Sequence, residues 1–169
     1  KATSVLAPRF ETLVDRAELI FTGHVISQRT EWRNGNGQKS IVTLVSFAVQ
    51  QVHKGRAAAT VTLQFLGGTI GDVTLEVAEM PKFKAGERVV LFVEGNGVNA
   101  SPIIGFFHGR FLLRKDRVGR EAVWQYNGEP LAAVNEIGRG KRAAGPEVRS
   151  VSHEEFTFQI HQRVATQTK

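Results

Sequence analysis

The sequence predicts a mainly β protein, a small closed or half-closed antiparallel β-barrel flanked by a short N-terminal helix and a C-terminal helix. Three observations predict this class. Runs of alternating apolar and polar residues recur along the chain, glycine-rich turns separate these runs, and helical spacing of apolar residues occurs only near the two ends. The 169 residues are about the length of one domain, so we expect a single domain over residues 1–169, with its barrel at about 18–127.

The N-terminal part of the chain changes from helical to β-type spacing. Four apolar residues would share one face of a short amphipathic helix: Phe10, Leu13, Val14 and Ala17. Pro8 stands just ahead of them, where a helix start tolerates proline. Gly23 lies inside the β-rich run at 19–28, and a glycine inside a strand commonly marks a bulge or a sharp bend.

The middle of the chain reads as a succession of strands and turns. The Asn-Gly-Asn-Gly sequence at 34–37 is a strong hairpin signal. The run at 88–93 is almost continuously apolar, which is typical of a strand covered on both faces. We expect strands at residues 19–28, 40–52, 60–66, 73–77, 88–93, 103–113 and 123–126.

The C-terminal part begins with a change of composition. Residues 135–149 are small, basic and aperiodic, so we expect a flexible basic loop there. A helix is expected at about 152–165, because Ser152 and Glu155 have the spacing of a capping box. Three apolar residues of this helix form one stripe that should dock on the barrel: Phe156, Ile160 and Val164.

Cysteine is absent from the chain. Its absence excludes disulfides, cysteine-type zinc sites, iron–sulfur clusters and a cysteine nucleophile. No apolar run reaches the ~18 residues of a membrane span, so we expect no membrane-spanning helix. The first residue is lysine and not methionine, which is consistent with an exported protein, periplasmic or extracellular, whose signal peptide has been removed.

The polar residues show no catalytic or metal-binding pattern. His24 and His108 each stand beside a glycine in a β-rich run and favour a structural role, whereas His153 and His161 fit exposed positions on the C-terminal helix. The chain lacks the Gly-x-Ser-x-Gly sequence of a nucleophile elbow, and the glycine-rich loop at 67–71 precedes a strand and not a phosphate-binding helix. We therefore expect no catalytic residue, metal or cofactor, although an enzyme with an unfamiliar site remains the third hypothesis.

The basic charge of the chain is uneven. Residues 104–149 carry nine basic and five acidic side chains, against eleven and nine over residues 1–103. Seven cations are candidate polyanion-binding residues: Arg110, Arg114, Lys115, Arg117, Arg139, Lys141 and Arg142. Five aromatic residues are interleaved with this segment, as on single-strand nucleic-acid binders: Phe106, Phe107, Phe111, Trp124 and Tyr126. The alternative is an ordinary solvated face above core aromatics.

Three segments resemble a known family in their order. Residues 13–25, Leu-Val-Asp-Arg-Ala-Glu-Leu-Ile-Phe-Thr-Gly-His-Val, resemble the opening of netrin-like domains, the module also found in tissue inhibitors of metalloproteinases. Residues 43–55, which end in His-Lys-Gly, look like the second strand of that family. The sequence Phe-Lys-Ala-Gly-Glu before the apolar run at 88–93 is similar to that of exported bacterial relatives. The resemblance covers about residues 10–115.

The resemblance implies an OB-like five-stranded barrel with flanking helices in an exported protein that recognises another protein. Metalloproteinase inhibitors place an N-terminal cysteine on the catalytic zinc, but this chain has no cysteine, so neither the inhibition nor any site residue carries over. The leading hypothesis is a non-catalytic exported binding or accessory domain that recognises a protein partner. The alternative is an OB-like binder of single-stranded nucleic acid or another polyanion through residues 104–149.

Overall fold

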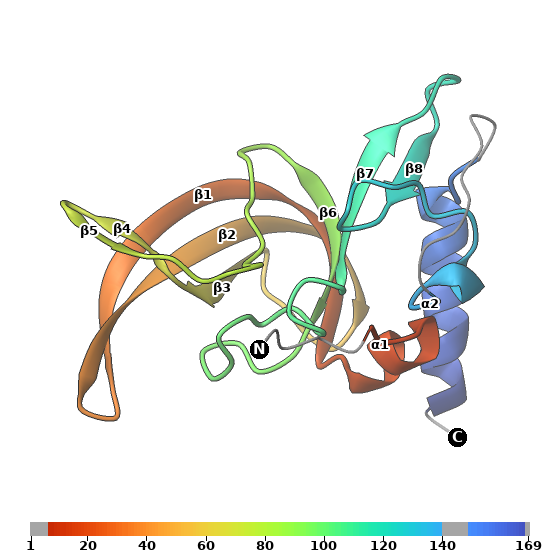
Figure 1. Ribbon diagram of the computed structural model, residues 1–169. Coiled ribbons are helices and arrows are strands. Elements are labelled where there is room, and N and C mark those ends of the chain that lie inside the picture. The colour runs from red at the N-terminus through yellow and green to blue at the C-terminus, as the bar shows by residue number, and fades with distance from the viewer. Residues whose placement is uncertain (1–6, 140–148, 168–169) are drawn as a thin grey trace.

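The computed structural model describes residues 7–139 and 149–167, and it is mainly β (Figure 1). The described part has two α-helices, eight strands and one short 3-10 helix. In chain order they are α1 (Phe10–Arg16), β1 (Leu19–Gly35), β2 (Gln38–Lys54), β3 (Thr60–Leu66), β4 (Gly68–Ile70), β5 (Val73–Leu75), β6 (Arg88–Val93), β7 (Arg110–Lys115), β8 (Glu121–Trp124), the 3-10 helix η1 (Val134–Glu136) and α2 (His153–Gln167).

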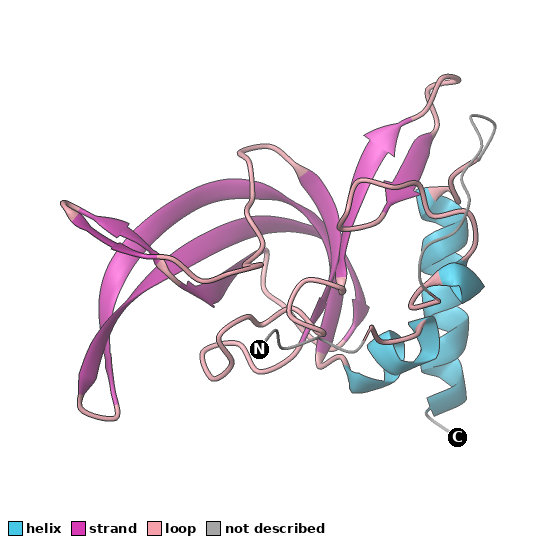
Figure 2. Ribbon diagram, in the orientation of Figure 1, coloured by secondary structure: helices cyan, strands magenta, loops and turns pink. Residues whose placement is uncertain are grey.

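Six strands form one antiparallel sheet in the order β3-β2-β1-β6-β7-β8, and β4 and β5 form a separate small sheet (Figure 2). This confirms the mainly β class with a helix near each end. Of the two expected forms, closed or half-closed, the closed barrel is wrong, because the outer strands β3 and β8 do not pair with each other. The loop after β6 bonds to the free edge of β3 instead: the Asn96 side chain joins the Gln64 N–H and the Thr62 carbonyl, both at 2.9 Å. A loop on that edge leaves no room for a closing strand.

The strands β1 and β2 form a long, strongly bent ribbon that arches away from the helices (Figure 1). The predicted bend at Gly23 is confirmed, because the pairing register of β1 and β2 shifts between Thr22 and Gly23. A Cβ atom on Gly23 would lie only 2.4 Å from the Ala48 carbonyl oxygen, so the two strands approach there as only glycine permits. At the far end Asn36 and Gly37 form the predicted tight turn with positive φ.

The sheet separates two apolar cores. One core lies between the sheet and the helices and includes Ile20, Phe92 and Phe156, whereas the other lies inside the curve of the sheet and includes Phe21, Phe47 and Leu91. Successive residues of β1 and β6 alternate between the two cores, as the period of a strand requires. The prediction that residues 88–93 are covered on both faces is confirmed.

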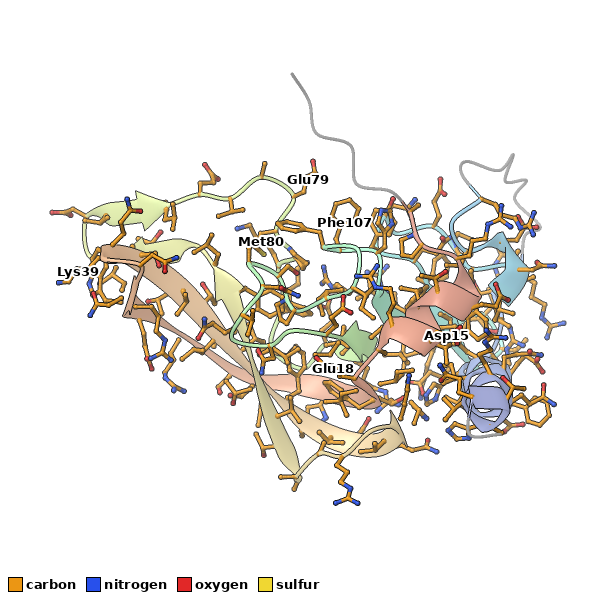
Figure 3. The ribbon with its side chains drawn as sticks, turned by 90° about the horizontal axis from the view of Figure 1, so that it is seen from below. Asp15, Glu18, Lys39, Glu79, Met80 and Phe107 are labelled. Carbon is orange, nitrogen blue, oxygen red and sulfur yellow. The ribbon has the colours of Figure 1, made fainter. Side chains whose placement is uncertain are left out.

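The two helices pack side by side on one face of the sheet (Figure 1). The predicted apolar faces are buried, with Phe10, Leu13 and Val14 inward on α1 and Phe156 and Ile160 inward on α2. The Ser152 hydroxyl accepts the Glu155 N–H at 3.0 Å, as expected for the cap of α2. Arg163 of α2 forms a two-bond ion pair with Asp15 of α1, at 2.9 and 2.6 Å. Figure 3 shows Asp15 on α1 beside α2.

The end of β2 locks α1 to the sheet. Lys54 donates hydrogen bonds from Nζ to the carbonyls of Val14 at 2.7 Å and Asp15 at 3.1 Å, at the C-terminal end of α1. Gly55 has φ +84°, and a Cβ there would lie 2.2 Å from the Glu18 carbonyl oxygen. We call Glu18, Lys54 and Gly55 the α1 junction. It brings together two of the segments on which the family resemblance is based.

Several expected segments have different bounds in the structure: the strand expected at 19–28 extends to Gly35, and those expected at 73–77 and 123–126 are β5 and β8, which end at Leu75 and Trp124. The strand expected at 103–113 begins only at Arg110, because residues 103–109 form a compact series of turns. The segment expected as a flexible loop at 135–149 starts inside η1, and Ile137 is buried in the core beside the helices. Residues 140–148 lie outside the described part of the chain.

Candidate functional site

Four aromatic rings gather next to the open end of the β7–β8 hairpin: Phe106, Phe107, His108 and Tyr126. The ring centroids of Phe107, His108 and Tyr126 lie 4.5 to 4.9 Å from one another, and that of Phe106 lies 6.4 Å from that of Phe107. All four rings are partly exposed, and Tyr126 has 38% of its surface accessible. We call these four residues the aromatic surface.

The loop that carries three rings of the aromatic surface, Phe106, Phe107 and His108, is held by its own hydrogen bonds. Gly105 and Phe106 both have positive φ, at +68° and +70°. A bulky residue rarely adopts this conformation, and such backbone strain persists only where the surroundings enforce it. Here the Ser101 hydroxyl donates to the Phe106 carbonyl at 2.6 Å, and the Gly109 N–H donates to the Ile104 carbonyl at 2.9 Å. The rings are therefore presented by a fixed backbone.

A pocket of about 360 Å³ adjoins the aromatic surface. Its walls combine the rings of His108 and Tyr126 and the ring of Pro8 with the polar side chains of Gln125 and Asn127. Glu129 and Glu136 also line the pocket, so its wall combines aromatic rings with polar and acidic side chains. Figure 3 shows Phe107 at a margin of the molecule, well apart from Lys39 at the far end of the β1–β2 ribbon.

A second cluster lies between α2 and the sheet, with Thr22 and His53 buried at its centre. The His161 Nε2 lies 2.8 Å from the His53 Nδ1, and the Thr22 hydroxyl lies 2.7 Å from the His53 Nε2 and 2.9 Å from the His153 Nε2. The chain of contacts continues through His153 Nδ1 to the Glu121 carboxylate at 3.3 Å. We call Thr22, His53, His153, His161 and Glu121 the histidine network. It joins strands β1, β2 and β8 to two successive points along α2.

One arrangement of protons satisfies every group of the network while all three imidazoles are neutral. His153 must turn its Nδ1–H toward the Glu121 carboxylate, which leaves its Nε2 to accept from Thr22. The Thr22 oxygen then accepts from His53 Nε2–H, and the His53 Nδ1 accepts from His161 Nε2–H. The opposite direction would set a lone pair of His153 against the carboxylate. Glu121 therefore fixes the direction of the whole chain.

Burial dominates the electrostatics of the network. Desolvation, with the nearby His161 and His153, lowers the pKa of His53 to about 4. Burial also lowers the pKa of His153, although the Glu121 carboxylate opposes this shift. The Glu121 pKa is lowered chiefly by the hydrogen bonds from Arg88, at 2.5 and 2.8 Å. At neutral pH the interface therefore holds neutral imidazoles of His53 and His153 beside a charged Arg88–Glu121 pair.

The order Thr22–His153–Glu121 matches the nucleophile, base and acid of a hydrolytic triad. The Thr22 hydroxyl, however, is not accessible to a substrate as a nucleophile must be. Only 1% of the Thr22 surface is accessible, and its hydroxyl lies between two imidazoles under α2. A nucleophile must reach a substrate carbonyl, and this hydroxyl cannot do so in the described conformation. Within residues 7–139 and 149–167, no group of three or more His, Asp or Glu side chains is arranged to hold a metal ion.

The structure distributes the predicted polyanion-binding residues over separate places. Arg110 is largely buried, with an ion pair to Glu87 at 2.8 Å and its guanidinium 4.4 Å from the ring centroid of Phe83. Arg114, Lys115 and Arg117 are exposed at the tip of the β7–β8 hairpin.

The remaining candidate cations lie elsewhere. Arg139 lies after η1, where its Nε donates to the Asn135 carbonyl. Lys141 and Arg142 are outside the described residues.

The aromatic residues of this segment are separated from the exposed cations. Phe111 is buried in the core beside the helices, and Trp124 packs against the core inside the sheet. Phe107 precedes β7 and Tyr126 follows β8, so both lie at the end of the hairpin opposite to its basic tip. The pattern of interleaved rings and cations in the sequence does not become one mixed surface in the fold.

Sequence reasoning missed the histidine network. The expectation that His153 lies exposed on its helix is wrong, because it points toward Thr22 with only 19% of its side chain accessible. His161 is exposed, but it still reaches His53. A usable signal was present: Thr22 is a polar residue in the apolar run at 19–25, on the same face as the buried Ile20.

Comparison with known proteins found no matching family model, no matching curated protein and no matching solved structure. Neither of the helices in the described residues is long and apolar enough to cross a membrane.

Proposed function

We propose that this protein is a non-catalytic binding domain that recognises a protein partner through the aromatic surface. The observation that carries the proposal is the cluster of partly exposed rings of Phe107, His108 and Tyr126, the first two on a loop held by its own hydrogen bonds and the third just after β8. Aromatic residues supply most of the binding energy at protein interfaces, particularly where a pocket lies beside them.

The rigidity of the loop favours binding for an energetic reason. A mobile segment loses conformational freedom when a partner orders it, and this loss reduces affinity. The left-handed backbone at Phe106 and the bonds from Ser101 and Gly109 fix the rings beforehand. A partner would then bury aromatic area at a small entropic cost.

The relationship to exported netrin-like domains and their OB-like fold is part of this proposal. Support comes from the α1 junction, where the Glu18 backbone packs against Gly55 and Lys54 caps α1. These are the positions that carry the family resemblance, and each has a structural role in joining the first helix to the first two strands. We propose on the same grounds that the domain works outside the cytoplasm.

Site-specific photocrosslinking tests the protein-binding proposal. A photoreactive phenylalanine analogue replaces Asn127, which lines the pocket, and in a matched protein it replaces Phe158, an exposed aromatic residue on α2 with 55% of its surface accessible. Both proteins are expressed in the cells that make this domain and are irradiated there. We expect a discrete adduct from position 127 that is lost with the additional change Phe107→Ala.

The control at position 158 measures unspecific capture by an exposed aromatic group. Equal adduct patterns from positions 127 and 158 would contradict the proposal, and so would an adduct from position 127 that Phe107→Ala leaves unchanged. Turnover of a substrate that is lost on changing a single pocket residue would contradict its non-catalytic part.

The exposed cations at the hairpin tip favour a second candidate function, binding of single-stranded nucleic acid or another polyanion. Arg114, Lys115 and Arg117 lie within four residues of one another on exposed backbone. Fluorescence anisotropy with a labelled oligonucleotide at ~50 and ~200 mM salt tests it, because phosphate-driven binding weakens steeply over this range. Binding that depends on salt and is lost in the triple alanine variant supports it, whereas absence of binding at the lower salt removes it.

A further inference from the structure

The histidine network lies at the interface that holds α2 on the sheet. His153 is the first residue of α2, and His161 lies two turns farther along the same helix. Both contact residues of the sheet, His153 through Thr22 on β1 and His161 through His53 on β2. Histidine side chains therefore hold α2 to the sheet at two positions along the helix.

The surroundings of His53 provide cations and neutral groups but no free carboxylate. Its two ring nitrogens contact Thr22 and His161, and its ring lies beside His153. The adjoining Lys54 is a cation already bonded to the end of α1. The carboxylates on neighbouring elements are engaged elsewhere, Asp15 on α1 with Arg163 and Glu121 on β8 with Arg88.

Within the described residues, protonation of His53 consequently places a charge that no carboxylate contacts, because the Glu121 carboxylate lies against His153 Nδ1 instead, at 3.3 Å. A proton on His53 creates a charge in a buried position, with the imidazole rings of His153 and His161 beside it. When α2 moves away, His53 meets water and its two neighbouring imidazoles leave with the helix. The displaced arrangement therefore binds protons more readily than the docked one.

We propose that the histidine network is an acid-operated latch: protonation of its imidazoles loosens α2 from the sheet while the strands of the sheet stay paired. The strands stay paired on acidification because the backbone hydrogen bonds of the β1–β2 ribbon involve none of the titrating side chains. The ion pairs Asp15–Arg163 and Arg88–Glu121 persist because the hydrogen-bonding arginines lower the pKa of both carboxylates.

The size of the effect follows from the proton linkage of His53. With a pKa of about 4 when docked and an ordinary value of about 6.5 when released, the opening equilibrium of α2 increases about 30-fold between pH 7.5 and pH 5. Hydrogen exchange of the α2 amides, corrected for the intrinsic pH dependence of exchange, measures this equilibrium directly.

The variant His53→Gln keeps a polar group near Thr22 and removes the titration. Its α2 amides should gain less than 5-fold in opening over the same pH range. His24→Gln on β1, outside the network, is the matched control and should retain the roughly 30-fold increase of the natural protein. If His53→Gln folds poorly, an NMR pH titration of the histidine ring signals in the natural protein tests the proposal instead. The proposal requires His53 to remain neutral at pH 5.

Three results would overturn the latch. The first is a similar increase of α2 exchange in the natural protein and in His53→Gln. The second is exchange of the β1 and β2 amides in step with α2, which would indicate unfolding of the whole domain. The third is ordinary titration of His53 near pH 6.5.

Discussion

The histidine network and the aromatic surface both depart from the usual pattern of apolar residues inside and polar residues outside, the first by burying polar groups and the second by exposing apolar ones. In the network, hydroxyl and imidazole groups are buried under a helix and satisfy one another. At the aromatic surface, apolar rings are left partly in water on a loop that is rigid. Buried polar groups and exposed apolar clusters are the informative exceptions in a folded protein. The histidine network contributes to the stability of the fold. The aromatic surface presents rings that the domain itself does not fully bury.

Because of this difference, we expect mutations in the two regions to have different effects. Changes in the interface that includes the histidine network and the α1 junction should lower the free energy of unfolding. Changes at the aromatic surface should leave the fold intact and remove an interaction.

The largest expected effect concerns the α1 junction. Gly55→Ala should lower the free energy of unfolding by about 3–4 kcal/mol, because the new Cβ meets the Glu18 carbonyl oxygen and the left-handed backbone is strained. Gly119→Ala is the matched control, since Gly119 has nearly the same φ but nothing within 4 Å of its added Cβ. The control should lose only about 1 kcal/mol in urea unfolding. Equal losses in the two variants would contradict the account of the junction.

The stability of the natural protein should decrease on acidification. Because the folded state lowers the pKa of His53 to about 4, the unfolded state binds more protons between pH 6.5 and pH 4. The contribution of this histidine is therefore complete above pH 6.5 and is lost as the pH falls toward 4. We expect a loss of about 2–3 kcal/mol over this window. Urea unfolding at pH 7, 5 and 4 measures it, and stability independent of pH over this range would contradict the assignment.

A smaller effect is expected from removing the hydroxyl at the centre of the network. Thr22→Val preserves the shape of the side chain but leaves His53 and His153 each without a partner at Nε2. Two unsatisfied buried groups should cost about 2 kcal/mol. Thr60→Val, at an exposed position of β3, is the control and should change the free energy of unfolding by less than about 0.5 kcal/mol. A neutral Thr22→Val would show that the network does not contribute to stability.

Local patterns predicted the elements of the fold well. Helical spacing located α1 and α2, the alternation at 60–66 located β3, and Gly23 marked the bend of the ribbon. Closure of the sheet was mispredicted, because the capping of β3 by Asn96 depends on a loop 32 residues away and leaves no periodic signal. Contacts between distant segments determine such features, and the spacing of residues within one segment does not encode them.

The candidate sites were harder to predict for the same reason. Thr22, His53 and His153 lie in three separate segments, and no motif connects them. The aromatic residues and cations of 104–149 are interleaved along the sequence, and this mixing suggested a common surface. The register of β7 and β8 sends Phe107 and Tyr126 to one end of the hairpin and Arg114 to Arg117 to the other.

The most direct test of this division measures one variant in two ways. Phe107→Ala removes a partly buried ring, so its free energy of unfolding should fall by about 1–2 kcal/mol, which leaves the domain folded. In the same protein, the crosslinking yield from a photoreactive residue at position 127 should fall at least tenfold. A crosslinked partner retained at full yield in this variant would contradict the central claim that the aromatic surface is the binding site.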